Sequence, residues 1–388
     1  MKPTVFTGAR LFDGTAFRDG SLVVENGRVQ AILPPGSPLA GLAEHPLDGG
    51  ILAPGFVDLQ VNGGGGVMFN DSPSPETLRT VADAHAGLGA TTILPTLITD
   101  TPDITRAAVA AAIAATRAGM PGIAGLHLEG PHLSVARKGA HDPRLIRPMT
   151  ADDLNAMTDA ASQLPRLMVT LAPESVTPDQ VRILAQAGIV ISLGHTDAGF
   201  DTCRLYADAG ATCVTHLFNA MSQLGNREPG LVGAALSDGR LHTGLIADGI
   251  HVHPATITSA LAAKAGPGGF FLVSDAMAPA GSVLTQFTLN GRRIARRDGM
   301  LLLDDGTLAG ADLDLPRALR VLISAVVGAG DPALAMATSV PGQVLGRAGR
   351  IIPGAPADLV HLDDGLHLRA VWRGAVAIPL SAGLDRRS

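Results

Sequence analysis

Three residues whose side chains can bind a metal ion stand where apolar, strand-like segments of the sequence end. Glu129 closes the segment 123–128, His195 follows 189–193, and His216 ends 212–216. One carboxylate and two imidazoles suit zinc or another borderline divalent ion that keeps an open position for water. A lone strand-end histidine is more often structural, and a carboxylate there is often only solvated. The three together indicate a metal site, provided the fold brings these strand ends together.

A fourth residue, Asp275, could move protons beside such an ion. It follows the apolar segment 270–273. A carboxylate at that point can take a proton from an activated water and later deliver it to a leaving group. The alternative is that Asp275 only caps the end of its strand. Gln60 and Asn62 also stand at a strand end, where neutral amides would be poor ligands for zinc.

The elements that must position these residues alternate between strands and helices over most of the chain. Eight apolar segments are the predicted strands: 55–62, 91–97, 123–128, 167–171, 189–193, 212–216, 243–246 and 270–273. The predicted helices between them start at proline or an acidic turn and stop near glycine, as in 75–88, 102–118, 151–163, 178–187 and 254–265. This pattern predicts an α/β fold, a (β/α)₈ TIM barrel. Because active sites of such barrels lie at the carboxyl ends of the strands, the four residues above are expected to converge.

The two ends of the chain have a different sequence pattern, in which short β-prone runs are separated by turn pairs such as Asn26-Gly27. Asn-Gly between two β runs is a strong hairpin signal. Neither end has enough apolar surface to fold alone. We therefore expect residues 1–53 and 347–388 to form one small β-sandwich domain, and residues 54–346 to form the barrel.

Two further features are expected in the last third of the barrel. Repeated Asn-Gly and Asp-Gly pairs predict a β-hairpin insertion at about 286–308, near the barrel mouth. Two helices, over about 315–328 and 332–339, would then complete the barrel.

The composition limits the classes of partner. The chain has 388 residues, of which 46% are hydrophobic and 16% charged, with a formal net charge of −6. No nucleic-acid partner is expected, because phosphate backbones require a basic surface. Two cysteines without C-x-x-C spacing do not make a disulfide framework. The first residues lack the apolar core of a signal peptide, and no apolar run is long enough to span a bilayer. We expect a soluble, cytoplasmic protein with no membrane partner.

Several short motifs occur in a fixed order along the predicted barrel. They are PGFVDLQVNG (54–63), LHLEGPHLS (126–134), KGAHDP (138–143), SLGHT (192–196), THLFNAM (215–221), REPGL (227–231), ADGIHV (247–252) and SDAMAPAG (274–281). In number and order they resemble the N-acetylglucosamine-6-phosphate deacetylases of the amidohydrolase superfamily. The resemblance implies metal-dependent hydrolysis of N-acetyl-D-glucosamine 6-phosphate to D-glucosamine 6-phosphate and acetate, in amino-sugar catabolism or cell-wall recycling.

Carried over position by position, the resemblance also implies roles for residues. The metal ligands fall on Glu129, His195 and His216, and the catalytic residues are Asp275 and His141, the latter stabilising an oxyanion. The positions that match the family's substrate contacts are Ala140, His141, Asn219, Ala220, Arg227, Asp248, Gly249, Ile250, His251, Ala309, Gly310 and Ala311. In that family the phosphate is held by residues matching Arg227 and His251, with the arginine reaching in from the neighbouring subunit. A homodimer is therefore expected.

Two positions depart from the wider pattern. Superfamily members with two metals carry His-x-His at the end of the first strand, whereas this chain has Gln60 and Asn62 there. We therefore expect one divalent metal ion per subunit, zinc first, with Fe²⁺, Co²⁺ and Mn²⁺ as alternatives. Ala309 and Ala311 stand where relatives often have serines around Gly310, so backbone contacts could persist there but hydroxyl contacts could not.

Other functions remain open on sequence. The substrate could be the galactosamine epimer, or an amide cleaved by another C–N hydrolase of the superfamily, such as a cyclic amidase. A binding protein for sugar phosphates that has lost catalysis is a rival of a different class. The intact set of metal and catalytic residues argues against that rival.

Overall fold

The computed structural model, which describes residues 2–326, 330–346 and 348–381, is built around a parallel sheet of eight strands. The strands are β8 (Phe56–Val61), β11 (Ala90–Ile98), β12 (Leu126–Glu129), β13 (Leu167–Leu171), β14 (Val190–Leu193), β15 (Ala211–Val214), β16 (His242–Leu245) and β17 (Phe270–Leu272). Each strand pairs in parallel with the next one along this series. Nearly all of their residues are buried, as expected for strands covered on both faces.

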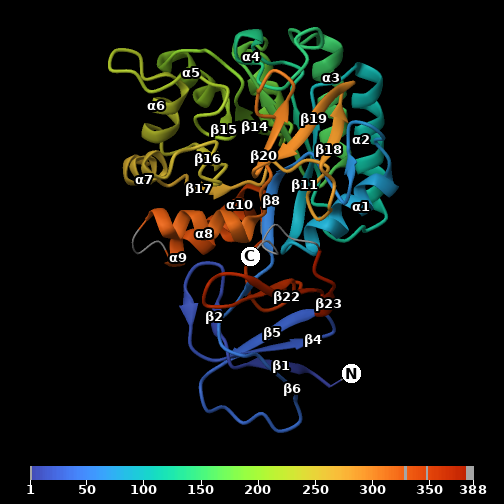
Figure 1. The fold of residues 1–388 in the computed structure, drawn as a ribbon, viewed down its shortest axis with the longest axis vertical. Helices are drawn as coiled ribbons and strands as arrows, with labels where there is room; N and C mark the ends of the chain where they lie inside the picture. Colours follow the sequence, from blue (N-terminus) through green and yellow to red (C-terminus); the bar gives the residue numbers. More distant parts are fainter. Residues whose placement is uncertain (1, 327–329, 347, 382–388) are drawn as a thin grey trace.

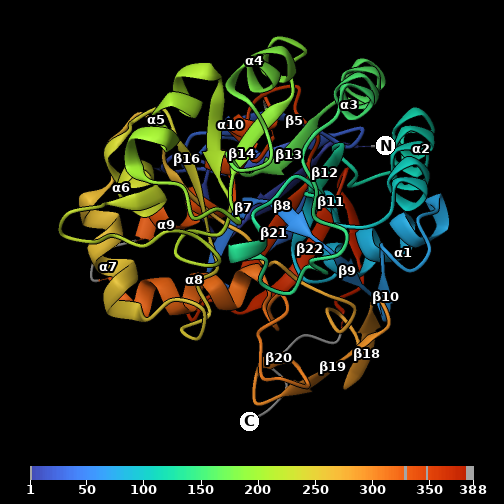
Figure 2. The same ribbon diagram turned by 90° about the horizontal axis from the view of Figure 1, so that it is seen from above.

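The sheet closes on itself where its first and last strands meet. Val61 and Ala276 form a parallel bridge, and Asn62 N donates to the carbonyl oxygen of Ala276 over 2.9 Å. The buried carboxylate of Asp58 accepts a hydrogen bond from Ser274 N at 3.2 Å across the same seam. Figure 2 shows the helices arranged around the strands. These features confirm the predicted TIM barrel.

The helices of the barrel begin at the signals that the sequence carries. They are α1 (Pro75–Ala86), α2 (Pro102–Arg117), α3 (Ala151–Gln163), α4 (Pro178–Gln186), α5 (Phe200–Ala209), α6 (Gly230–Ser237), α7 (Pro254–Ala263), α8 (Leu315–Ala325), α9 (Gly330–Ala337) and α10 (Ser339–Val344). The hydroxyls of Ser74, Thr101 and Thr177 each cap a helix whose first residue is proline. The predicted end of the helix over 315–328 falls within 327–329, outside the described residues.

Both ends of the chain contribute to a pair of sheets that lie below the barrel in Figure 1. One has the order β5 (Arg28–Leu33), β4 (Ser21–Glu25), β1 (Thr4–Thr7), β6 (Ala43–Pro46). The other has the order β23 (Val376–Ile378), β22 (Leu368–Arg373), β21 (Leu359–Leu362), β7 (Ile51–Pro54), β2 (Arg10–Phe12), β3 (Phe17–Arg18).

An apolar core joins these two sheets. Phe6 and Leu22 of the four-stranded sheet pack with Leu52, Leu359 and Trp372 of the six-stranded one. The antiparallel pairing of β7 with β21 ties the two ends of the chain together. The arrangement confirms a small β domain made from both termini. Its division from the barrel at 53/54 and 346/347 stays a prediction, and residues 347 and 382–388 lie outside the described residues.

The predicted hairpin insertion is a three-stranded antiparallel sheet, formed by β18 (Gln286–Leu289), β19 (Arg292–Arg297) and β20 (Met300–Leu303). The chain reverses direction at two successive turns, so the insertion contains two consecutive hairpins where one was predicted. In each turn, Asn290-Gly291 and Asp298-Gly299, both residues have positive φ, as type I′ turns require. A smaller hairpin, β9 (Gly63–Gly64) with β10 (Val67–Met68), follows β8. In the described ranges no helix is long and apolar enough to cross a membrane.

Candidate metal centre and substrate pocket

The three predicted metal ligands converge inside the barrel mouth. His195 Nε2 lies 3.1 Å from His216 Nε2, and Glu129 Oε1 lies 3.3 Å from the former and 3.2 Å from the latter. All three side chains are buried. A tetrahedral ion with bonds near 2.0–2.1 Å would hold its ligand atoms about 3.3 Å apart. The triangle of donor atoms therefore fits one divalent ion.

The ring of His195 is already oriented for such a role. Its Nδ1 lies 2.8 Å from the carbonyl oxygen of Arg137. Because a carbonyl can only accept, Nδ1 donates, which leaves Nε2, facing the other two donor atoms, as the nitrogen that can bind an ion. His216 has no such support, since its buried Nδ1 makes no hydrogen bond within the described structure.

His141 lies next to this triangle and belongs to an overlapping set. Its Nε2 is 3.8 Å from Glu129 Oε2, and the possible ligand atoms of Glu129, His141 and His195 all lie within 4.8 Å of one another. The set with His216 is tighter and matches tetrahedral spacing better, so we assign the ligand role to His216. Burial, followed by the neighbouring His195, lowers the pKa of His141 to about 3, so its ring is neutral.

A short chain of hydrogen bonds holds His141 in place. Thr99 Oγ1 lies 2.8 Å from His141 Nδ1 and 3.1 Å from the carbonyl oxygen of Glu129. Thr99 has one hydroxyl proton: its donation to Glu129 O leaves the ring proton of His141 on Nδ1, whereas its donation to Nδ1 instead places the ring proton on Nε2, on the side of the ligand set. The backbone next to His141 is held by Arg292 of β19, whose Nη2 donates to the carbonyl oxygen of Ala140 at 2.5 Å.

Asp275 lies three residues beyond β17 and is buried. Asn62 Nδ2 donates to its Oδ1 over 2.7 Å. Burial, together with the negative charge of Glu129, raises the pKa of Asp275 to about 6. For Glu129 itself burial acts in the same direction, but hydrogen bonds to His195 and His216 outweigh it and lower its pKa. Of two nearby carboxyl groups, Glu129 is thus the one kept ionised and Asp275 the one that exchanges protons more readily.

The backbone at these strand ends is unusual. His195, His216 and Asp275 have φ values of 49°, 28° and 47°, in the left-handed region that residues with a Cβ rarely adopt. Such conformations cost roughly 1–3 kcal/mol each and concentrate at functional sites. Here all three side chains enter the same cavity.

A cavity of about 340 Å³ contains the site. Of the residues predicted to contact substrate, those that line it are Ala140, His141, Asn219, Ala220, His251 and Gly310. Those that do not are Arg227, Asp248, Gly249, Ile250, Ala309 and Ala311. Asp248 contacts a residue that does line the cavity, because its carboxylate lies 2.6 Å from His251 Nδ1. Arg227 is exposed in the loop before α6.

The cavity is also lined by residues that were not predicted from the sequence to belong to the site. They are Ile98, Gly139, Ile246, Met277, Gly306, Thr307 and Leu308. Two of them could have been found from strand position, since Ile98 ends β11 and Met277 lies two residues after Asp275. The loop 306–308 could not, because the three-stranded insertion sets where the chain re-enters the barrel mouth.

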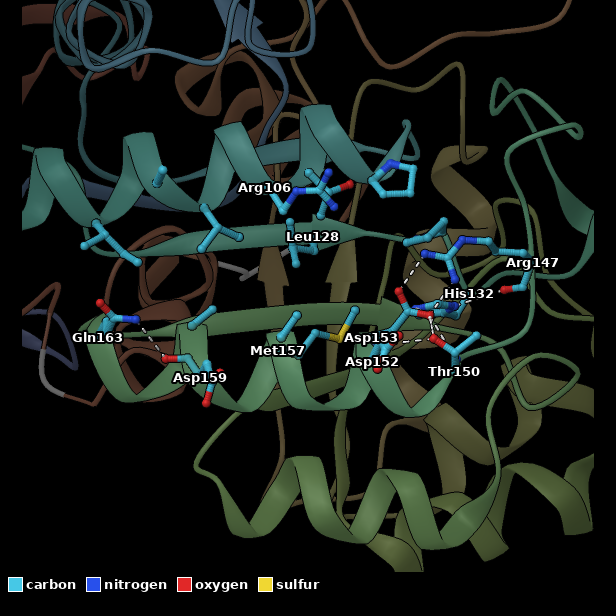
Figure 3. A pocket seen from close by; sticks show the side chains of 18 residues that line it. Arg106, Leu128, His132, Arg147, Thr150, Asp152, Asp153, Met157, Asp159 and Gln163 are labelled. Carbon is cyan, nitrogen blue, oxygen red and sulfur yellow. Dashed lines mark hydrogen bonds and ion pairs between the residues drawn. The ribbon is translucent and has the colours of Figure 1, made fainter.

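A second, larger cavity of about 590 Å³ lies outside the barrel, between α2 and α3 (Figure 3). Its polar end holds His132, whose Nδ1 lies 3.0 Å from Arg147 O, and the ion pair between Arg147 and Asp153. None of the predicted metal ligands or catalytic residues lines it. The smaller cavity at the strand ends is therefore the candidate active site.

Comparisons with known proteins show what the whole chain is similar to. The amidohydrolase family model matches residues 51–380. An N-acetylgalactosamine-6-phosphate deacetylase of Shewanella sp. (strain ANA-3) is 44% identical over 84% of this chain and 82% of its own length. An N-acetylglucosamine-6-phosphate deacetylase of Haemophilus influenzae is 32% identical over 88% and 90%. The crystal structure of N-acetylglucosamine-6-phosphate deacetylase from Pasteurella multocida superposes with a TM-score of 0.92, at 31% identity, over 97% of this chain and 99% of that one.

Proposed function

The chain belongs to the amidohydrolase family, and we propose that it removes acetate from N-acetyl-D-glucosamine 6-phosphate to give D-glucosamine 6-phosphate. The observation that carries this function is the triangle of Glu129, His195 and His216, with Asp275 in the same buried cavity. We propose one zinc ion per subunit, because two imidazoles and one carboxylate are typical zinc ligands. Cys203 and Cys213 are both free and buried, which fits the reducing cytoplasm.

When bound, a divalent ion at this triangle supplies Lewis-acid activation of a water and of the acetyl carbonyl. Asp275 takes the proton that this water loses as its oxygen attacks the carbonyl carbon. Asp275 then gives the proton to the amine nitrogen as the C–N bond breaks. The hydrogen bond from Asn62 holds one carboxylate oxygen in place through both transfers and leaves the other free for the proton.

His141 has a second role at the carbonyl. This role requires that Thr99 turn its hydroxyl proton from Glu129 O to His141 Nδ1, because the ring proton is then on Nε2 and can donate a hydrogen bond to the carbonyl oxygen as negative charge develops there. The neutral state of the ring is compatible with this role, because a neutral imidazole still donates through one nitrogen.

The phosphate group requires positive charge. Within the described structure the residues lining the cavity include no lysine and no arginine, and His251 is the basic group away from the ligand set. The carboxylate of Asp248, 2.6 Å from His251 Nδ1, orients the ring. We propose that Arg227 of a second subunit supplies the remaining charge, since a guanidinium binds phosphate in a bidentate manner.

The contribution of Arg227 to the site of the neighbouring subunit can be tested with two inactive variants. Arg227→Ala and Asp275→Asn are each expected to lose most activity alone. In a hybrid dimer, the subunit with an intact Asp275 receives Arg227 from its partner, so one complete site forms. A 1:1 mixture after subunit exchange should regain about a quarter of wild-type activity. No recovery, with hybrid dimers shown to be present, would mean that Arg227 serves its own subunit.

A second candidate substrate is N-acetyl-D-galactosamine 6-phosphate, favoured by the 44% identity to the Shewanella enzyme named for it. The two substrates differ only in the configuration at one sugar hydroxyl. The discriminating experiment measures acetate release from both epimers, each with and without the 6-phosphate. Phosphorylated substrates should be preferred, and the epimer with the higher kcat/KM is the substrate. If each sugar without the 6-phosphate were deacetylated as fast as its phosphorylated form, the proposed phosphate site would be contradicted.

A further inference from the structure

One corner of the site cavity is apolar. Ile98, Ala140 and Met277 line the cavity and belong to one hydrophobic cluster with Leu301, in the core of the three-stranded insertion. Ile98 and Met277 are only 4% and 2% exposed. The three-stranded insertion therefore packs against the side of these residues that faces away from the cavity, and they are not part of a loose surface loop.

This corner flanks the reacting groups. Ile98 is the register partner of Glu129 in the ladder between β11 and β12. Met277 packs on Gly310, where an added Cβ would lie 2.7 Å from Met277 Cγ and 2.7 Å from the carbonyl oxygen of Asp275. The side chain of Met277 therefore lies against the backbone that carries Asp275. The apolar corner therefore borders the strand position of the ligand carboxylate at Ile98 and the backbone of the proton-transfer residue at Met277.

The proposed substrate has one group that matches this corner. Its hydroxyls, amide and phosphate are polar and would lose hydrogen bonds against an apolar wall. The acyl methyl is apolar and is joined directly to the attacked carbonyl carbon, so it must lie within about 1.5 Å of that carbon. We propose that Ile98, Ala140 and Met277 receive the acyl methyl, and that Met277 limits the length of the acyl chain. This inference rests on the proposed deacetylase activity.

Met277 is the residue to change. It contributes three heavy atoms beyond Cβ, whereas Ala140 contributes none, and the flexible thioether fills the space without a fixed shape. Met277→Ala should open room for longer acyl groups. Met277→Leu keeps a similar volume and should keep the wild-type preference between acyl groups.

The test compares N-acetyl- and N-butyryl-glucosamine 6-phosphate on each protein preparation. The measured quantity is the ratio of the two kcat/KM values, which does not depend on the folded fraction of a sample. In Met277→Ala the butyryl-to-acetyl ratio should rise about tenfold or more, because a site discriminates one methylene by about 10–200-fold. Met277→Leu should keep the ratio within about twofold, since its volume is conserved. Leu301→Ala should also keep it, because Leu301 is buried in the same cluster but does not line the cavity.

Ile98→Ala provides an independent second variant, should Met277→Ala fail to fold. An unchanged ratio in whichever of these two variants is active overturns the inference. A separate outcome concerns the proposed function: a metal-loaded wild type that releases acetate from neither the glucosamine nor the galactosamine substrate removes the deacetylase assignment. Acetate release with unaltered acyl preference removes only the acyl-binding role of this corner.

Discussion

Gln60 Nε2 donates a hydrogen bond over 2.9 Å to Glu129 Oε1, the carboxylate oxygen that lies 3.2 Å from His216 Nε2. The amide thus presents hydrogens, not a lone pair, to the candidate ligand set. Asn62 does the same for Asp275, at 2.7 Å. The end of β8 therefore holds two functional carboxylates in place and adds no ligand of its own.

Replacing both amides with imidazoles should create ligands for a second ion. The double variant Gln60→His with Asn62→His is expected to bind more metal per chain than the wild type, because imidazole is a far better zinc ligand than an amide. Gln60→Ala with Asn62→Ala removes the donors without adding ligands and should stay at one ion. The measurement is metal per chain by inductively coupled plasma mass spectrometry. Unchanged content in the histidine variant would show that the amides do not exclude a second ion.

Asp275→Asn should separate metal binding from proton transfer. The amide keeps the size of the side chain but cannot accept a proton from water, so kcat should fall by about 10²–10⁴-fold. Metal content should not change, since Asp275 is not one of the three ligands. Acetate release and metal content are measured on the same sample. A variant that turns over near the wild-type rate would exclude Asp275 from proton transfer.

Thr99 sets which nitrogen of His141 carries the proton. Thr99→Val removes the hydroxyl that lies 2.8 Å from His141 Nδ1, and should lower kcat about tenfold, the effect of losing one hydrogen bond to a catalytic group. Thr99→Ser keeps the hydroxyl and serves as the matched control. Wild-type kcat in the valine variant would mean that the proton position on His141 does not affect the reaction.

The small β domain carries a separate, pH-dependent contribution to stability. Asp13 accepts hydrogen bonds from Thr15, Ala16 and Arg18. Burial alone would raise the pKa of Asp13, but these bonds outweigh it and lower the pKa to about 2. Because the folded pKa lies below the unfolded value near 3.9, the stabilisation is present above about pH 4 and is lost as the pH falls toward 2.

Asp13→Asn should therefore lower the free energy of unfolding by about 1–2 kcal/mol at pH 7, and by progressively less below pH 4. The single tryptophan, Trp372, lies in the core of this domain, so its fluorescence during urea unfolding reports on this region. A difference between wild type and variant that stays constant from pH 7 to pH 2.5 would contradict the assigned role of the Asp13 charge.

Much of the fold could be predicted because its signals are local. Apolar runs marked all eight barrel strands, and hydroxyl caps followed by proline marked helix starts such as Pro75 and Pro178. The residue types at strand ends then led to one group of side chains that share a cavity, because parallel strands in a closed barrel bring their carboxyl ends together. Glu129, His195, His216 and Asp275 were identified in this way, from residue type and strand position alone.

Other features depend on long-range packing and could not be read locally. The pairing of β7 with β21 joins segments about 300 residues apart along the chain. The apolar corner at Met277 forms because residues of the three-stranded insertion pack against Met277, and nothing in the surrounding sequence predicts that contact.

The most direct test of metal-dependent deacetylation is acetate release before and after metal removal. The protein is stripped with a chelator, assayed with the glucosamine and galactosamine substrates, and then reloaded with one equivalent of Zn²⁺, Fe²⁺, Co²⁺ or Mn²⁺. Activity should disappear with the metal and return at one ion per chain, in a protein that stays folded throughout. Full activity in the metal-free protein would contradict the assignment of Glu129, His195 and His216 as the ligands of a catalytic ion.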